Sequence, residues 1–215
     1  MIKVLIADDH AVVRRGLRQI LDDTDGEIRV MGEAVNGREV LDKVQAQDWD
    51  VLVLDITMPG RSGLDILKDI RQLKSALPVL ILSMHAEEQF ATRMLKAGAS
   101  GYLNKESAPE ELVKAIRKVH NGGKYVSSAH AERMVLELTD HFDKPPHERL
   151  SDREFEILCL MASGKTPTQI GKELALSVKT ISTYRSRIME KMKFSTSAQI
   201  THYAIVNGLV NNYPA

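Results

Sequence analysis

The first 121 residues of this 215-residue chain alternate strand signals and helix signals five times. Five short runs rich in Val, Ile and Leu are separated by segments whose apolar residues recur every three and four positions, which is the spacing of one helix face. We predict strands at residues 3–7, 28–34, 51–55, 78–83 and 101–104. Regular alternation of this kind predicts a parallel sheet with helices on both faces.

The number of units narrows the topology. Five βα units suit the doubly wound, flavodoxin-like α/β fold, in which the strands have the order 2-1-3-4-5. In such a sheet the first and third strands are neighbours where the order reverses, and ligands bind outside the carboxyl ends of the strands. The unbroken apolar run VLVL ends in Asp55 at that edge of the sheet.

Polar residues follow the other predicted strands at the same edge. The first strand ends in Asp8 and Asp9, the fourth ends in Ser83, and the fifth leads to Lys105. A single Asp before a loop is usually a turn cap, but three carboxylates at one point are costly unless a cation balances them. Carboxylate oxygens with room for water are the ligands of Mg²⁺. With a hydroxyl and an ammonium beside them, the site suits a phosphoryl group on Asp55.

The second half of the chain contains only helix signals. Asn121 to Gly123 stops the fifth helix, Ser127 or Ser128 can cap a further helix through Leu138, and the polar segment DKPPHE (143–148) is predicted to be a flexible tether. We expect a first domain at 1–121, a linker at 122–146 and an all-helical domain at 147–211. The helix starts in the last domain are marked by cap residues: Ser151 with Glu154, Thr166 with Gln169, Ser177, and Ser195 or Thr196.

Charge and composition limit the class of protein. The overall net charge is zero, but from His147 onward nine Lys and Arg face six Asp and Glu, a weak sign of nucleic-acid binding. There is one cysteine, no apolar segment long enough to span a bilayer and no signal-peptide core. We therefore expect a cytoplasmic protein with no membrane partner.

The strand-end residues resemble the receiver domain of two-component response regulators, over residues 1 to about 121. The resemblance implies that Asp55 is the phosphoacceptor, that Asp9 binds Mg²⁺ directly and Asp8 through water, and that Thr57 adds a backbone carbonyl. It also implies roles for three further residues: Ser83 as the switch hydroxyl, Lys105 as the phosphate-binding lysine and Tyr102 as the switch aromatic. Tyr102 could equally be an ordinary half-buried strand aromatic.

Two positions depart from the receiver pattern. Glu106 stands where many receivers have a proline after the lysine, which affects the expected loop geometry. Thr57 lacks the acid or amide that would orient an attacking water, so slow self-dephosphorylation is expected. The same Thr57 argues against a haloacid-dehalogenase-like phosphatase, which needs a second Asp at that position as general acid. The protein is therefore not expected to be an enzyme.

The segment from Leu150 to about 210 resembles the LuxR-type DNA-binding domain, although two capped helices in any small bundle would show the same pattern. With a receiver in front, the whole chain resembles the NarL/FixJ family. The resemblance implies that the helix from Val178 reads DNA, with Ser182, Thr183 and Ser186 at base edges and with Lys179, Thr180, Tyr184, Arg187 and Lys191 completing the DNA-binding set. The last helix would serve dimerisation through Ala198, Ile200, Ala204 and Ile205, residues that could equally close the core of the monomer.

These inferences combine into one expectation. The chain would be a transcriptional regulator that accepts a phosphoryl group on Asp55 from a cognate sensor histidine kinase, uses Mg²⁺ as cofactor and binds double-stranded promoter DNA as a homodimer. The alternative is a receiver-containing interaction protein that is controlled by partner binding, with phosphorylation incidental.

Overall fold

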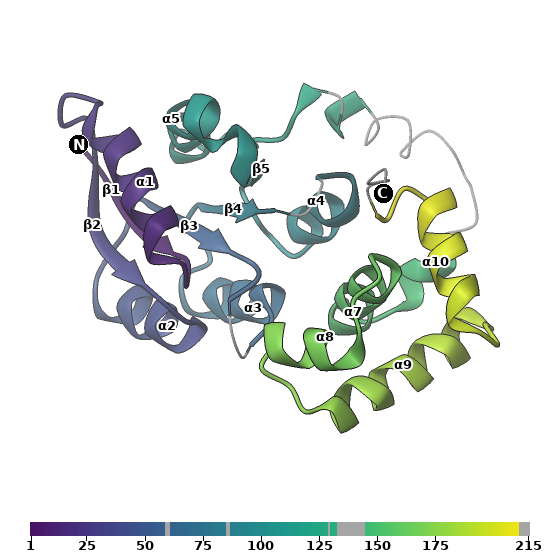
Figure 1. Cartoon of the computed structure of the whole chain (residues 1–215). Helices are drawn as coiled ribbons and strands as arrows, with labels where there is room; N and C mark the ends of the chain where they lie inside the picture. The colour runs from purple at the N-terminus through teal and green to yellow at the C-terminus, as the bar shows by residue number, and fades with distance from the viewer. Residues whose placement is uncertain (59–60, 85–86, 129, 133–144, 211–215) are drawn as a thin grey trace. The chain divides into compact units, whose positions relative to one another are not determined.

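The computed structural model describes residues 1–58, 61–84, 87–128, 130–132 and 145–210 of the chain. It divides into two compact units, Met1–Met134 and Val135–Ala215. Figure 1 shows that the first unit contains the sheet and that the second is helical in its described part.

The first unit is built on a five-stranded parallel sheet with the order β2-β1-β3-β4-β5, as predicted. The strands are β1 (Ile2–Ala7), β2 (Ile28–Ala34), β3 (Val51–Asp55), β4 (Val79–Ser83) and β5 (Gly101–Asn104). The fourth strand begins one residue later than predicted because Pro78 has no N–H to donate; its carbonyl still accepts a hydrogen bond from Leu52 N at 2.9 Å.

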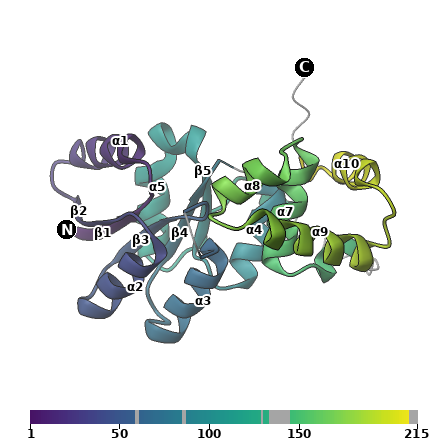
Figure 2. The ribbon, with the colours of Figure 1, turned by 60° about the horizontal axis from the view of Figure 1, so that its bottom comes forward.

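Helices cover both faces of the sheet. In Figures 1 and 2, α1 and α5 lie on one face, and α2 and α3 lie on the other. The first pair closes a core with alternate residues of β1, Ile2, Val4 and Ile6, while β3 and β4 are buried along their whole length. The helix bounds are α1 (Ala11–Asp22), α2 (Gly37–Ala46), α3 (Gly63–Leu73), α4 (Glu87–Lys96) and α5 (Ala108–His120).

The register of the strands determines which polar residues are neighbours at the site. Ala7 of β1 lies beside Leu54 of β3, so the residues that follow them, Asp8 and Asp55, are neighbours. Ser83 of β4 lies beside Asn104 of β5, directly before Lys105. The parallel arrangement therefore gathers the predicted polar residues at one edge.

The start of the linker is helical, as expected. Ser127 Oγ accepts a hydrogen bond from His130 N at 3.1 Å, which is an N-cap contact. The predicted extension to Leu138 lies outside the described residues. The end of the predicted flexible tether has local structure, because Pro146–Arg149 forms the 3₁₀ helix η2, closed by a bond from Glu148 N to Pro145 O. The flexibility of the tether stays a prediction.

The second unit contains α7 (Asp152–Ala162), α8 (Pro167–Glu173), α9 (Val178–Met192) and α10 (Ser197–Val206). Both predicted capping boxes are present, and Ser177 caps α9. Thr196, not Ser195, caps α10, and it forms a third capping box with Gln199. Gly171 faces the turn between α8 and α9, where an added Cβ would lie 2.7 Å from Leu176 O. A glycine is therefore required for the tight turn.

Candidate phosphoacceptor site and DNA-binding helix

Three carboxylates converge at the carboxyl edge of the sheet. Asp8 and Asp55 are almost fully buried, and the Asp9 side chain is 26% exposed. One ligand atom from each of Asp8, Asp9, His10 and Asp55 lies within 4.8 Å of the others. We define these three carboxylates together with Lys105 as the acidic pocket.

Lys105 is the cation of the acidic pocket. Its Nζ lies 2.7 Å from Asp8 Oδ2 and 2.8 Å from Asp55 Oδ2, and its side chain is 9% exposed. Burial alone would lower the pKa of Lys105, but the Asp55 and Asp8 carboxylates outweigh it and raise the pKa above its ordinary value. The ammonium group is therefore charged, and it pairs with two of the three carboxylates of the pocket.

Asp55 is held at both of its oxygens. Thr57 donates from its backbone N–H (3.0 Å) and from its hydroxyl (2.8 Å) to Asp55 Oδ1, while Lys105 donates to Oδ2. The Thr57 hydroxyl contact was not foreseen from the sequence. The role of the Thr57 carbonyl as a metal ligand stays a prediction.

The donor set fits a divalent cation. Asp8 Oδ2 and Asp9 Oδ1 are buried oxygens without a hydrogen bond of acceptable geometry, although each has a nearby nitrogen. Lys105 Nζ approaches Asp8 Oδ2 at 2.7 Å, and His10 Nδ1 lies 2.9 Å from Asp9 Oδ1. Buried carboxylate oxygens with unused acceptor capacity suit Mg²⁺, whose ligands are oxygen atoms.

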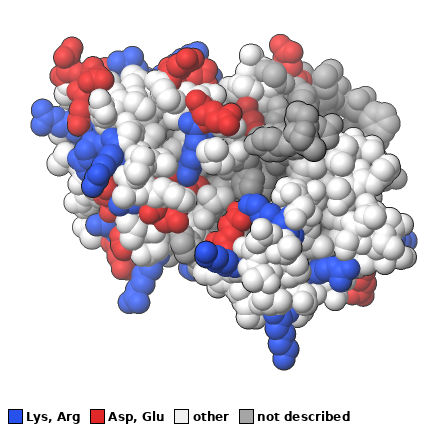
Figure 3. Space-filling model, in the orientation of Figure 1, with Lys and Arg blue, Asp and Glu red and all other residues white. Residues whose placement is uncertain are grey.

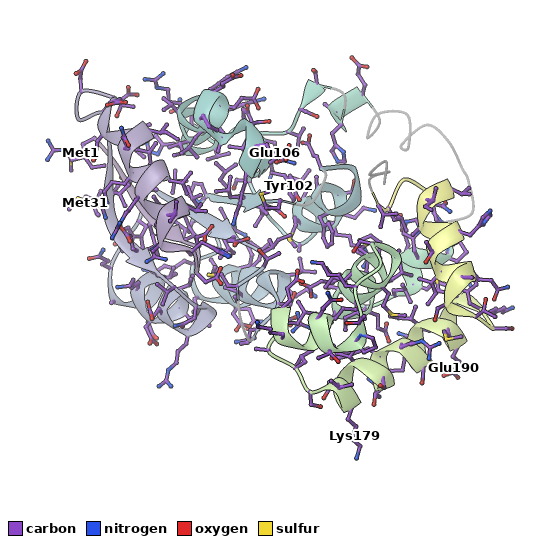
Figure 4. All side chains as sticks on the ribbon, in the orientation of Figure 1. Met1, Met31, Tyr102, Glu106, Lys179 and Glu190 are labelled. Atoms are coloured by element: carbon purple, nitrogen blue, oxygen red, sulfur yellow. The ribbon has the colours of Figure 1, made fainter. Side chains whose placement is uncertain are left out.

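The predicted switch residues are both buried. Ser83 is 0% exposed at the end of β4, and Tyr102 is 1% exposed on β5. Figure 4 shows Tyr102 within the first unit, on β5. Tyr102 is therefore not half-buried, as the alternative interpretation expected, but fully buried. The switch roles of Ser83 and Tyr102 stay predictions.

Lys105 is positioned without a following proline. Asn104 Oδ1 accepts a hydrogen bond from Glu106 N at 2.8 Å and caps the 3₁₀ helix η1 (Lys105–Ser107). A side-chain cap therefore sets the local turn. Behind the pocket, Arg14 donates from Nη1 to Asp8 O at 2.8 Å, a support that no sequence pattern indicated.

The predicted base-reading residues of α9 share one exposed region. Ser182, Thr183 and Ser186 are exposed, and each hydroxyl donates to the carbonyl four residues earlier at 3.0 to 3.2 Å. Each hydroxyl oxygen keeps acceptor capacity for a ligand. Lys179 points away from the unit at the start of α9 (Figure 4).

Other predicted DNA-binding residues have varied surroundings. Arg187 is exposed, Tyr184 is half-buried, and the Thr180 hydroxyl lies 2.7 Å from Ser177 Oγ. Lys191 has a partner that the sequence could not show, because its Nζ lies 2.6 Å from Glu154 Oε2 of α7. The Lys191 side chain is 42% exposed, and its phosphate contact stays a prediction.

The predicted dimerisation set is divided by burial. Ile200 and Ala204 are 0% exposed within their own unit, so the expectation that they face a second copy is wrong. Their helix turns these two side chains toward the core that α10 forms with α7. Ala198 and Ile205 are exposed, and Val206 extends the exposed apolar surface.

Surface charge differs between the units on the side shown in Figure 3. Lys and Arg are interspersed with Asp and Glu over the first unit, whereas the second presents mostly uncharged side chains with isolated charges. Among the described residues, no helix combines the length and apolarity needed to cross a bilayer.

Two family models match the chain. The response regulator receiver domain matches residues 4–117, and the LuxR family of bacterial regulatory proteins matches residues 148–204. The response regulator UvrY of Escherichia coli strain K12 is 37% identical over 212 residues, covering 98% of this chain and 97% of UvrY. The response regulator GacA of Pseudomonas aeruginosa is 34% identical, with coverage of 98% and 99%.

A solved structure is similar over nearly the whole chain. RcsB from Salmonella enterica serovar Typhimurium, bound to promoter rprA in the presence of the phosphomimetic BeF3⁻, is 27% identical with a TM-score of 0.65. The match covers 94% of this chain and 97% of RcsB. The chain therefore belongs to the NarL/FixJ family of response regulators, with a receiver domain and a LuxR-type DNA-binding domain.

Proposed function

We propose that this response regulator accepts a phosphoryl group on Asp55 and that the phosphorylated chain binds promoter DNA as a homodimer to control transcription. The observation that carries the proposal is the acidic pocket, where three carboxylates converge and Lys105 pairs with two of them, Asp8 and Asp55. We place this activity in the cytoplasm, where a sensor histidine kinase would supply the phosphoryl group.

The chemistry uses residues already in position. An Asp55 oxygen attacks the phosphorus of a phosphohistidine, the O–P bond forms as the N–P bond breaks, and the imidazole leaves with the electron pair and takes up a proton. Asp8, Asp9 and Asp55, with the Thr57 carbonyl, would hold Mg²⁺, which supplies positive charge to the phosphoryl oxygens. Lys105 and the Ser83 hydroxyl would bind the remaining oxygens.

Phosphorylation would act by shifting a population. Once Lys105 and Ser83 bind phosphoryl oxygens, the ends of β4 and β5 have new partners, and the conformation that makes these contacts is favoured. We propose that this conformation dimerises, with Ala198 and Ile205 of α10 on the contact surface.

DNA binding is supported by the promoter-bound RcsB structure and by the LuxR-type match. We propose that α9 enters the major groove, with Ser182, Thr183 and Ser186 toward base edges. Short hydroxyl and methyl groups can contact several bases, so readout by these residues is permissive. Nearby residues would bind phosphates: Lys179, Thr180, Tyr184 and Arg187.

The first test identifies the phosphoacceptor. The full chain is incubated with acetyl phosphate and Mg²⁺, and the intact protein is examined by mass spectrometry. The wild type should gain one phosphoryl group and Asp55→Ala none, while Asp65→Ala, which removes an exposed acid from α3, should be labelled like the wild type. Equal labelling of all three proteins would place the acceptor elsewhere.

A second test addresses the dimer. Sedimentation of the full chain before and after acetyl phosphate treatment should show an increased dimer fraction. Ile205→Glu, at a side chain that is 45% exposed, should suppress that increase without unfolding the unit. If acetyl phosphate raises the dimer fraction of Ile205→Glu as much as that of the wild type, α10 is excluded from the interface.

A further inference from the structure

The first turn of α7 contacts both helices of the helix-turn-helix through charged side chains. Glu154 Oε2 lies 2.6 Å from Lys191 Nζ, near the end of α9. Arg153 donates from Nη2 to Leu174 O, at the C-terminus of α8, at 3.2 Å. The other terminal nitrogen of Arg153 pairs with Glu156 at 2.6 Å. We call these four charged residues the α7 brace: Arg153, Glu154, Glu156 and Lys191.

The carboxylate at the centre of the brace is buried. Glu154 is 3% exposed, and Oε2 also accepts the Ser151 N–H at 2.7 Å within the capping box. Burial would raise the pKa of Glu154, but Lys191 and Ser151 outweigh it and lower the pKa. A buried carboxylate is costly without a cation, and Lys191 supplies that cation.

Lys191 lies away from two of the three hydroxyl residues of α9. Because successive residues turn by about 100°, Lys191 projects about 180° from Ser182 and about 140° from Ser186 around the helix axis, but only about 80° from Thr183. Its neighbour Met192 is buried, and so is Ile188 one turn earlier. Lys191 therefore borders the face of α9 that packs into the unit.

We propose that Glu154 and Lys191 are positioning residues for DNA recognition, which set the direction of α9 instead of contacting DNA. This inference rests on the proposed DNA-binding function, and it replaces the phosphate contact expected for Lys191. Ser182 lies about 13 Å along the axis from Lys191, so a tilt of about 10° about the pair would move Ser182 by about 2 Å. Such a shift exceeds the tolerance of a hydrogen bond to a base edge.

Phosphate attraction responds differently to the same tilt. The Coulomb energy between exposed charges changes slowly with distance, so a shift of this size has little effect on contacts that depend on charge alone. Loss of the pair should therefore reduce binding to a preferred sequence and leave binding to random DNA nearly unchanged. This pattern separates a positioning role from a phosphate contact.

The test uses the full chain treated with acetyl phosphate and Mg²⁺. Two duplexes serve as probes: one enriched by the wild type from a random library, and one with scrambled sequence. Glu154→Gln preserves the capping-box geometry, because Gln is accepted at that position. Affinities of Glu154→Gln, Lys191→Met, the double variant and Lys191→Arg are measured at several salt concentrations.

Each single variant should bind the enriched duplex about tenfold more weakly, with unchanged salt slope and unchanged binding to the scrambled duplex. Because the two residues act as one pair, the double variant should bind the enriched duplex about as well as the single variant with the lower affinity. Lys191→Arg keeps the cation and should stay within about twofold of the wild type. As a control, Lys179→Met should weaken binding to both duplexes.

Three results would overturn the inference. Equal weakening on both duplexes by Lys191→Met, with a salt slope reduced by about one, would show a phosphate contact. Tighter binding of Glu154→Gln to the scrambled duplex would show that Lys191 had been withheld from DNA. If the single variants have a lower melting temperature but keep the wild-type ratio of affinities for the enriched and scrambled duplexes, the pair only stabilises the unit. Failure of the wild type to enrich any duplex would instead contradict the proposed DNA-binding function.

Discussion

The acidic pocket of the receiver and the α7 brace of the helical unit both bury carboxylates beside a lysine, but their charges balance differently. In the pocket, Lys105 pairs with the almost fully buried Asp8 and Asp55, and Asp9 lies beside them as a third carboxylate. In the brace, Glu154 pairs with Lys191 and Glu156 pairs with Arg153. Unbalanced buried charge is costly and indicates a ligand that the protein is built to take, whereas balanced charge stabilises the fold without one.

The two clusters also differ in how they satisfy their oxygens. In the pocket, Asp9 Oδ1 is buried without a hydrogen bond, and Asp8 Oδ2 has only the Lys105 ammonium beside it, at 2.7 Å. In the brace, Glu154 Oε2 accepts from both Ser151 N and Lys191 Nζ. Unused acceptor capacity therefore accompanies the excess negative charge, and the two features together distinguish a ligand site from a structural ion pair.

The largest effect should come from removing each lysine. Lys105→Met and Lys191→Met each leave a buried carboxylate without its cation, so each should destabilise its own unit by about 3 kcal/mol. Saturating Mg²⁺ should restore most of the stability of the receiver, because the pocket can take the ion, and none in the helical unit. Hydrogen exchange of β3 and α9 amides in the full chain reports the two units separately.

A surface pair provides the control for this comparison. Lys74 lies 2.7 Å from Asp48, but both side chains are well exposed, so Lys74→Met should change stability by less than about 1 kcal/mol. If Mg²⁺ fails to protect the receiver of Lys105→Met, the excess carboxylates do not form a cation site.

Local patterns were sufficient to predict much of the structure. Strand order followed from five βα units, and the order places Asp8, Asp55, Ser83 and Lys105 at one edge. Cap residues at helix starts were predictable because their hydrogen bonds span only three residues. Thr57 was predicted at the site, but its hydroxyl bond to Asp55 depends on the loop conformation.

Tertiary contacts explain what the sequence could not show. Lys191 and Glu154 are 37 residues apart, and no periodicity links them. The helix α10 carries apolar residues on more than one face, so the pattern could not separate the core residues Ile200 and Ala204 from the exposed Ile205. The proline pair before His147 is typical of a tether, yet His147 Nδ1 lies 2.9 Å from Tyr203 Oη and ties η2 to α10.

A smaller effect is expected from pH. The pKa of Glu154 is lower in the folded unit than in the unfolded chain, so the unfolded chain binds more protons as the pH falls. The contribution of Glu154 is complete above the ordinary glutamate value of about 4.3 and is lost as the pH falls through the depressed value. The urea midpoint of α9, followed by NMR at several pH values, should decrease as the pH falls below about 4.3. In Glu154→Gln this decrease should be smaller.

The smallest effect on the free energy of unfolding should come from replacing one carboxylate by an amide, with opposite signs in the two clusters. In metal-free protein, Asp9→Asn removes one of three neighbouring carboxylates, and relief of repulsion should stabilise the receiver by up to about 1 kcal/mol. The same variant should bind Mg²⁺ more weakly in titration calorimetry, because it lacks a charged ligand oxygen. Glu154→Gln should instead destabilise its unit, since it removes the partner of Lys191. Asp65→Asn, at an exposed position, should change neither quantity. If Asp9→Asn destabilises the metal-free receiver, the contact between Asp9 and His10 at 2.9 Å is a structural pair, and the excess charge of the pocket is smaller than proposed.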